Sequence, residues 1–174
     1  KVDPADRVYC PGYYEAGNRR FSCWEKKGHK HMDWWTGIAN SCDVYFYRMG
    51  LRAGGEAIEK YERKFGLGQR TRIGLPGERR GHVFGPENRK AELKREASWH
   101  DGDTCNLAIG QGELLVTPVQ MAVVAAAVAN RGTLWRPQFV SRIEYEDGRP
   151  EYKPRPEELG RVALKTKTWD LLDE

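Results

Sequence analysis

Ser41, Cys42 and Asp43 are three neighbouring residues whose side chains could do chemistry. A serine hydroxyl can donate and accept a hydrogen bond at once, whereas an ionised carboxylate only accepts. Together they could form half of an acyl-transfer site, and the thiol between them is a potential metal ligand. Serine and aspartate are also good helix N-caps, so a capping role is the alternative.

Three cysteines and one histidine have a spacing that allows a metal site. Cys10, Cys23, His29 and Cys42 follow the pattern C-x12-C-x5-H-x12-C, and three thiolates with one imidazole suit a closed, structural zinc site. The pattern lacks a C-x-x-C knuckle, so the spacing leaves other interpretations open. Cys10 and Cys23 could form a disulfide, the thiols could be free, or His31 could replace His29.

The charges of the chain are interleaved. The sequence has 29 Lys and Arg and 25 Asp and Glu, with a net charge of +4, and neither sign gathers in one block. Proteins that track phosphates usually concentrate basic residues on one face, so nucleic acid is not an expected partner. A basic patch facing an anionic wall polymer or a membrane surface is compatible with this charge.

The chain reads as part of a larger domain. It begins at Lys1-Val2-Asp3-Pro4 without a start methionine and stops at Leu171-Leu172-Asp173-Glu174 without a polar tail. Its longest apolar stretch, residues 121–129, is far shorter than the ~20 residues of a spanning helix. We therefore expect any membrane anchor or export signal to lie upstream.

The elements expected around Ser41 are short. Residues 1–31 are rich in Gly, Pro, Cys and aromatic residues, which indicates loops and short strands. Asp33 is a good N-cap for a helix through Asn40, and Val44 to Leu51 is predicted to be a second helix. Residues 32–66 thus form a helical part, with residues 41–43 at the helix junction.

A third helix is predicted from Gly55 to Phe65. Its apolar face is expected to consist of Ala57, Ile58, Tyr61 and Phe65, and Gly66 suits a left-handed C-terminal residue. Residues 67–107 contain many Gly, Pro and charged residues and are interpreted as a rim excursion with short strands. Cys105 has no obvious partner and is expected to be a small core residue.

Residues 108–135 are predicted to contain a buried helix. Thr117 is its N-cap, Pro118 its first residue, and Gln120 completes a capping box. The run that follows is apolar on nearly all faces, which indicates burial. Residues 136–174 are predicted to form a strand over Gln138 to Tyr145, a turn at Asp147-Gly148 and a surface segment.

Seven motifs in order resemble the transpeptidase domain of class B penicillin-binding proteins, and most closely the elongation-type penicillin-binding protein 2 group. The two longest are GIANSCDVYFYR, from Gly37 to Arg48, and IGQGELLVTPVQMA, from Ile109 to Ala122. The others are Cys10-Pro11-Gly12-Tyr13-Tyr14, Gly28-His29, Lys64-Phe65-Gly66-Leu67-Gly68, Thr71-Arg72-Ile73-Gly74-Leu75 and Gly102-Asp103-Thr104.

The resemblance implies a mixed α/β (α+β) fold like that of serine β-lactamases, of which this chain holds mainly the helical part. It implies a peptidoglycan D,D-transpeptidase of cell-wall elongation and cell shape, acting through an acyl-serine intermediate. The family's Ser-x-x-Lys and Lys-Thr-Gly motifs are absent from this chain. Lys165-Thr166-Lys167 has the wrong third residue and is interpreted as solvated surface.

The resemblance also assigns roles to individual residues. Ser41 would hydrogen-bond the lysine of the nucleophile motif and pass a proton to the departing D-alanine nitrogen, and Asp43 stands where asparagine is commoner. Some members of the group have a zinc site beside Ser-x-Asp, with acidic residues at the positions of Cys10 and Cys23. The histidine and cysteine of that site correspond to His29 and Cys42.

The expected partners also follow from the resemblance. They are peptidoglycan stem peptides, β-lactams, a SEDS-type glycan polymerase and elongation scaffold proteins, at the extracytoplasmic face of the bacterial cell membrane. Two alternatives are kept: a non-catalytic, zinc-stabilised interaction module of the wall-synthesis machinery, and a soluble β-lactam-binding relative.

Overall fold

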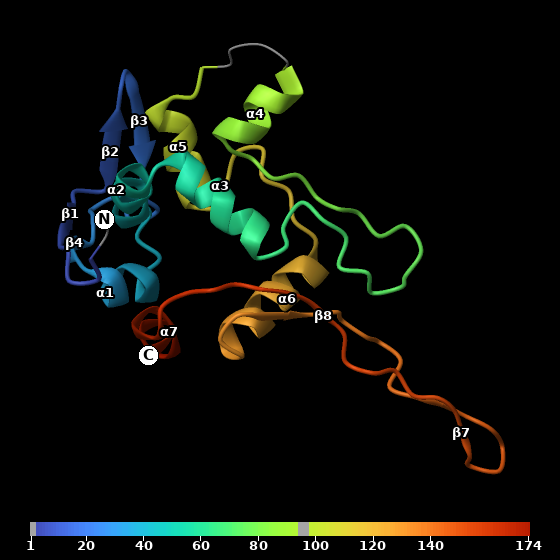
Figure 1. Cartoon of the computed structure of the whole chain (residues 1–174). Coiled ribbons are helices and arrows are strands. Elements are labelled where there is room, and N and C mark those ends of the chain that lie inside the picture. Colours follow the sequence, from blue (N-terminus) through green and yellow to red (C-terminus); the bar gives the residue numbers. More distant parts are fainter. Residues whose placement is uncertain (1–2, 94–97) are drawn as a thin grey trace. The chain divides into compact units, whose positions relative to one another are not determined.

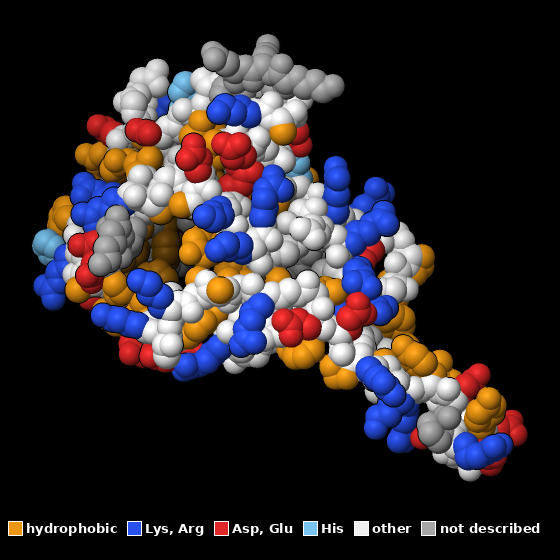
Figure 2. Space-filling view, viewed as in Figure 1, with side chains coloured by type: hydrophobic (Ala, Val, Ile, Leu, Met, Phe, Trp, Pro, Cys, Tyr) orange, Lys and Arg blue, Asp and Glu red, His pale blue; other side chains and the backbone are white. Residues whose placement is uncertain are grey.

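The structure is a computed structural model that describes residues 3–93 and 98–174 (Figure 1). The chain divides into two compact units, one with residues 1–61 and 83–114 and the other with residues 62–82 and 115–174. Within the described ranges, no helix is both long enough and apolar enough to cross a membrane. On the face shown in Figure 2, basic and acidic side chains lie among one another, as the interleaved sequence predicted.

The N-terminal segment forms two small antiparallel strand pairs. β1 (Val8–Cys10) pairs with β4 (Lys30–Met32), and β2 (Tyr13–Ala16) forms a hairpin with β3 (Arg19–Ser22). The register places Cys10 opposite Lys30, the residue after His29. The prediction of loops and short strands is confirmed.

Two helices follow and meet at residues 41–43. α1 (Trp34–Ala39) begins after the N-cap Asp33, whose Oδ1 accepts a hydrogen bond from the Thr36 N–H at 3.0 Å. α2 (Asp43–Ala53) begins after Cys42. Both helices and their junction were predicted, and for α1 the signal in the sequence was its N-cap Asp33.

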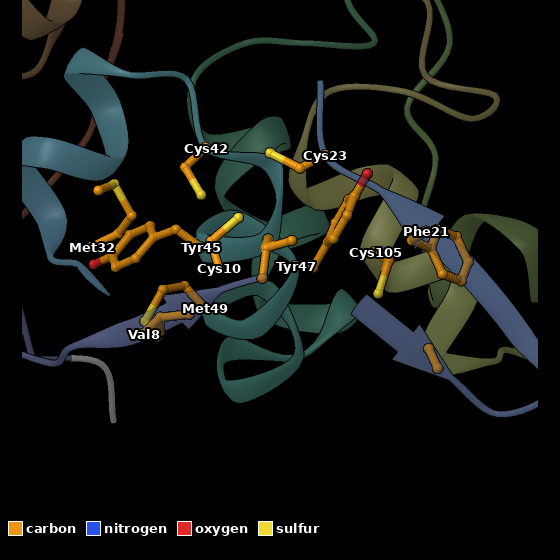
Figure 3. Packing of buried hydrophobic residues seen from close by; sticks show 12 residues of the cluster. Val8, Cys10, Phe21, Cys23, Met32, Cys42, Tyr45, Tyr47, Met49 and Cys105 are labelled. Atoms are coloured by element: carbon orange, nitrogen blue, oxygen red, sulfur yellow. The ribbon is translucent and has the colours of Figure 1, made fainter. Parts of the chain in front are cut away.

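The core of the first unit lies around α2. This helix buries Val44 together with Tyr45, Tyr47 and Met49, the last three of which are labelled in Figure 3. Burying a large apolar side chain stabilises a fold by about 1.5–3 kcal/mol. α5 (Asp101–Ala108) packs against α2 so closely that a Cβ at Gly50 would lie 2.3 Å from the Ala108 Cβ. Cys105 is fully buried in the same cluster, as predicted.

The apolar face predicted for α3 (Gly55–Lys64) is confirmed in part, because Ala57, Ile58 and Phe65 are half-buried. Tyr61 is 42% exposed, whereas the carboxylate-bearing Glu59 is only 2% exposed. The Glu59 carboxylate accepts hydrogen bonds from the N–H groups of Glu87 and Asn88, at 2.8 and 3.0 Å. These N–H groups belong to the first turn of a helix and have no partner within it, which explains a buried carboxylate.

The segment 67–107 differs from the prediction of short strands. It contains α4 (Pro86–Leu93) and α5, and outside the named strands the described residues show one isolated bridge, between His82 and Leu115. Gly66 is left-handed with φ +83°, as predicted. The proposed subdivision of the chain into five segments stays a prediction.

The second unit is built around α6 (Pro118–Ala129). Its capping box is confirmed: Thr117 Oγ1 accepts from the Gln120 N–H, and Gln120 Oε1 accepts from the Thr117 N–H. α6 is buried along one side only, not all round as its composition predicted, and Met121 is 47% exposed. The core residues of this unit are Val123, Ala127, Leu134, Val162 and Trp169.

The remaining elements of the second unit are short. β5 (Thr133–Trp135) pairs with β8 (Glu158–Arg161), and β6 (Ile143–Glu144) pairs with β7 (Pro150–Tyr152) across the predicted Asp147-Gly148 turn. The chain continues into α7 (Thr166–Asp173), which was not predicted. Lys165, Thr166 and Lys167 are exposed at its start, as expected of surface residues.

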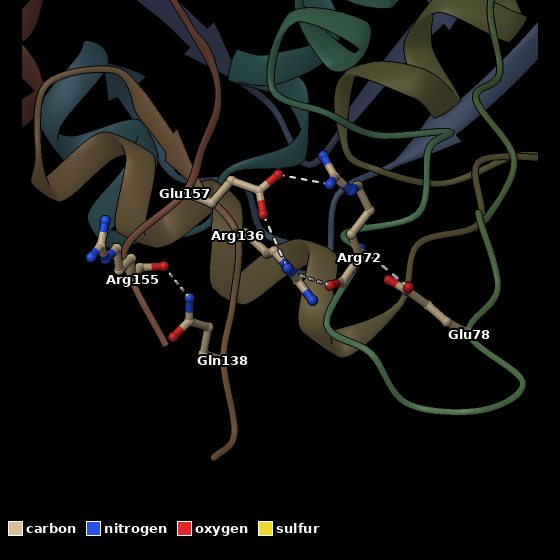
Figure 4. A network of polar contacts seen from close by, with 6 residues as sticks. All are labelled: Arg72, Glu78, Arg136, Gln138, Arg155 and Glu157. Atoms are coloured by element: carbon tan, nitrogen blue, oxygen red, sulfur yellow. Dashed lines mark hydrogen bonds and ion pairs between the residues drawn. The ribbon is translucent and has the colours of Figure 1, made fainter. Parts of the chain in front are cut away.

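Side-chain contacts replace part of the strand predicted over Gln138 to Tyr145 (Figure 4). Arg136 donates to the Arg72 carbonyl at 2.6 Å and to Glu157 at 3.0 Å, and Gln138 donates to the Arg155 carbonyl at 2.8 Å. These side-chain hydrogen bonds hold the start of the predicted strand segment, which has no continuous backbone pairing with another strand. Within that segment the strand is limited to β6.

Candidate functional site

The predicted metal ligands converge in the first unit. Cys10 ends β1, Cys23 follows β3, His29 precedes β4 and Cys42 is the N-cap of α2. One potential ligand atom from each residue lies within 4.8 Å of the others. The three cysteine side chains point toward a common point in Figure 3, so the four residues form a possible metal site.

The distances in this cluster fit a tetrahedral site. His29 Nδ1 lies 3.5 Å from Cys23 Sγ and 3.8 Å from Cys10 Sγ. Metal bonds of about 2.3 Å to sulfur and about 2.0 Å to nitrogen place two ligand atoms about 3.5 Å apart at the tetrahedral angle. His29 Nδ1 is therefore the nitrogen that faces the sulfurs.

Two alternatives drawn from the sequence do not match this geometry. All four cysteines are free, so Cys10 and Cys23 are not joined in a disulfide. His31 is exposed on β4 with its ring edge-on to Tyr9, outside the cluster. His29 is therefore the histidine that the fold brings to the sulfurs.

Gly28 explains how His29 reaches the cluster. Its φ is +76°, in the left-handed region that favours glycine, and a Cβ there would lie only 2.2 Å from the Cys10 carbonyl oxygen. Any other residue would push the loop away from β1. The glycine before His29 in the Gly28-His29 motif is therefore required for steric reasons.

Burial sets the protonation of the thiols. Burial raises the pKa of the Cys42 thiol to about 12 and also raises the pKa of Cys23. N–H groups at the start of α2 oppose this effect, from Asp43 and Val44 toward Cys23 and from Tyr45 toward Cys42. Burial outweighs these hydrogen bonds, so the raised pKa values favour the protonated thiols when no cation is bound.

Ser41 and Asp43 flank this cluster, but neither caps α2. The N-cap is Cys42, which makes no side-chain cap hydrogen bond. Ser41 is exposed and has φ +48°, an uncommon left-handed conformation for a residue with a side chain. Asp43 Oδ2 accepts a hydrogen bond from the Trp24 N–H at 2.9 Å. The structure therefore does not support the capping alternative.

Trp24 is the residue that the sequence interpretation missed. Its indole Nε1–H donates to the carbonyls of Asn40 and Ser41, at 3.0 Å each. Its ring lies edge-on to that of His29, with centroids 5.1 Å apart. The only signal in the sequence was its position directly after Cys23.

Asp103, in the Gly102-Asp103-Thr104 motif, makes a local ion pair. It accepts two hydrogen bonds from Arg89, at 2.8 and 3.1 Å, and one from the His100 N–H at 3.0 Å. The Arg89 guanidinium also lies over the rings of Phe84 and Trp99. These contacts join α4 to α5 and give the motif a structural explanation.

The chain is similar to known transpeptidases in sequence. The family described as "Penicillin binding protein transpeptidase domain" matches residues 1–174. Peptidoglycan D,D-transpeptidase MrdA of Acinetobacter baumannii is 35% identical over 134 residues, covering 76% of this chain and 20% of that protein. MrdA of Escherichia coli is 28% identical over 166 residues, covering 94% of this chain and 26% of that protein.

Solved structures show the same relationship. PBP2 of Pseudomonas aeruginosa, in complex with WCK 5153, matches with a TM-score of 0.81 and 31% identity, over 99% of this chain and 38% of that one. PBP2 of Helicobacter pylori, in a complex with MreC, matches with a TM-score of 0.80 and 28% identity, over 99% of this chain and 30% of that one. The predicted fold is confirmed as about a third of these chains.

The chain spans 20% and 26% of the two curated relatives above. The match to the family description extends over its whole length, and its backbone follows those of solved penicillin-binding proteins. The chain therefore belongs to the penicillin-binding protein transpeptidase family and is similar to its PBP2/MrdA members over most of its length.

Proposed function

We propose that this chain is the part of a peptidoglycan D,D-transpeptidase, of the elongation-type penicillin-binding protein 2 group, that carries the Ser-x-Asp motif and a structural zinc site. The observation that carries the proposal is that Ser41 and Asp43 flank Cys42, which is buried in the Cys-His cluster. Membership of the transpeptidase family supports the assignment.

In the proposed reaction a serine outside this chain attacks the D-Ala-D-Ala amide carbon. The carbon–nitrogen bond breaks, D-alanine leaves, and the acyl group passes from the serine to an amine on a second stem peptide. Ser41 hands a proton to the departing nitrogen and takes one from the catalytic lysine. Trp24 holds Asp43 Oδ2, so we assign Oδ1 to the lysine or to a substrate N–H.

Cys10, Cys23, His29 and Cys42 are the residues that would hold zinc. Four protein ligands leave no position for water, so the metal would be structural. The cluster joins the irregular segment 10–29 to Cys42 at the start of α2. Its proposed role is to keep Ser41 and Asp43 in fixed places.

The relatives support the proposed partners. A solved PBP2 is in complex with MreC, another similar structure is of a peptidoglycan synthase complex that coordinates polymerization and crosslinking, and PBP2 has been solved with WCK 5153. For this protein we propose stem peptides as substrates, β-lactams as inhibitors, and a SEDS-type polymerase and elongation scaffold proteins as partners. The site of action would be the extracytoplasmic face of the cell membrane.

Acylation by a fluorescent penicillin tests the proposed activity. The full-length protein should become labelled, and Ser41→Ala should slow labelling by about 100-fold, because a positioned proton shuttle contributes about that much. Ser141→Ala, at another exposed serine, should label at the wild-type rate. The isolated 174-residue chain should not label, because it has no Ser-x-x-Lys motif.

Other outcomes would contradict the proposal. Absence of labelling in the full-length protein would favour the non-catalytic interaction module. An unchanged rate in Ser41→Ala would remove Ser41 from the reaction. Metal analysis of purified protein should find zinc near one per chain, and a metal-free folded protein would refute the zinc site.

A further inference from the structure

Trp24 contacts the cluster and the Ser-x-Asp motif through separate groups. It follows Cys23 in the chain and its ring lies edge-on to His29, at an interplanar angle of 67°. Its backbone N–H donates to Asp43, and its indole N–H donates to the carbonyls of Asn40 and Ser41. One residue therefore touches a predicted ligand and both residues of the proposed relay.

Burial does not explain how Trp24 is held. Its side chain is 62% exposed, so little apolar surface leaves water when it takes this position. Its geometry is instead set by directed contacts, because the indole N–H is a donor only and finds two carbonyl acceptors. These contacts lie at the turn where Ser41, a residue with a side chain, is left-handed.

The Ser41 backbone needs such a restraint. Residues with a Cβ rarely adopt φ near +48°, and such conformations persist when surrounding contacts determine them. The Ser41 N–H donates to the Ile38 carbonyl and the Cys42 N–H to the Gly37 carbonyl, at 3.0 and 2.9 Å. The Trp24 indole holds the carbonyl side of the same turn.

We propose that Trp24 is a positioning residue that couples the Cys-His cluster to the proton relay. It holds the Asn40-Ser41 turn through its indole N–H and orients Asp43 through its backbone N–H. Movement of the loop between Cys23 and His29 is then transmitted to Ser41. The inference rests on the proposed function, because positioning matters only if Ser41 and Asp43 take part in the reaction.

The test replaces the indole donor and keeps an aromatic ring. In the full-length zinc-loaded protein, Trp24→Phe should lower the maximal rate of acylation by a fluorescent penicillin about tenfold, with little change in the concentration for half-maximal rate. Zinc content and melting temperature should stay at the wild-type values. Trp135→Phe, at another exposed tryptophan, is the matched control and should leave all four quantities unchanged.

Hydrogen exchange gives a readout that does not depend on activity. In Trp24→Phe the amides of Ser41 and Cys42 should exchange at least several-fold faster than in the wild-type protein, because the turn loses its restraint. The same amides should be unchanged in Trp135→Phe. Wild-type exchange and a wild-type acylation rate in Trp24→Phe would overturn the inference.

Zinc removal tests the coupling. Chelation should slow acylation of the wild-type protein and should have a smaller additional effect on Trp24→Phe, since both changes act through one turn. Equal effects in the two proteins would refute the coupling. If the wild-type protein is not labelled at all but exchange still rises in Trp24→Phe, the proposed function fails and Trp24 stands as the residue that holds this turn.

Discussion

At the residue scale, the Cys-His cluster depends on one nitrogen and three sulfurs that come from separate elements. His29 contributes Nδ1, while its Nε2 is buried and makes no hydrogen bond within the described residues. A metal-binding histidine usually donates its second N–H to a carbonyl or carboxylate. Here the Trp24 ring lies edge-on beside the imidazole instead.

Replacing each histidine in turn tests the ligand assignment. We expect His29→Gln to reduce zinc affinity by at least 10-fold and to lower the melting temperature, because one of four ligands is lost. His31→Gln, two residues away and exposed on β4, should keep full zinc content. Metal analysis after dialysis measures both, and loss of zinc in His31→Gln alone would reverse the assignment.

At the element scale, Gln120 joins α6 to the irregular segment that follows α3. Besides its role in the capping box, Gln120 Nε2 donates to the Gln69 carbonyl at 2.8 Å and to the Arg80 carbonyl at 2.9 Å. Its side chain is only 1% exposed. A buried amide with its donors and acceptor all paired can hold a segment that has no ladder of its own.

Removing this amide should loosen the segment. We expect Gln120→Leu to lower the free energy of unfolding by about 2–3 kcal/mol, because two carbonyls lose their donor and the Thr117 N–H loses its acceptor. Gln111→Leu, at an exposed glutamine, should change it little. Urea unfolding measures both variants. Equal stability of the two would show that water replaces the lost donors.

The capping box was readable from the sequence because its partners are three residues apart. The second role of Gln120 was not, since Gln69 and Arg80 are separated from it by many residues. Contacts between distant residues were also not readable at α3. There, helical periodicity identified the helix, but it did not show that Glu59 is buried. That carboxylate is buried only because α4, a helix that the sequence did not reveal, begins beside it.

At the scale of the whole molecule, both units contain carboxylates that are stabilised in their charged form. Burial alone would raise the pKa of Asp103, but hydrogen bonds from Arg89 and the His100 N–H lower it. In the second unit, the Arg136 hydrogen bond lowers the pKa of Glu157, with Arg72 also contributing, and the Thr71 hydroxyl lowers that of Glu78.

These shifts predict acid sensitivity. The ordinary pKa values are 3.8 for aspartate and 4.5 for glutamate, and the folded values lie below them. The stabilisation is therefore complete above pH 4.5 and is lost as pH falls through the folded values. Melting temperatures measured from pH 7 to pH 3 should fall, and less steeply for Asp103→Asn. An identical slope in that variant would contradict the role of Asp103.

The sequence by itself determined the family, the helices with capping signals beside them, and the four residues of the Cys-His cluster, because these depend on residue types at fixed local spacings. The tertiary structure decided whether Cys10 and Cys23 form a disulfide or an open cluster, and whether His29 or His31 lies in that cluster. It also decided which groups accept the hydrogen bonds of Trp24. Those choices depend on Gly28 passing close to β1 and on the turn before α2. Such contacts join residues that only the folded chain brings together.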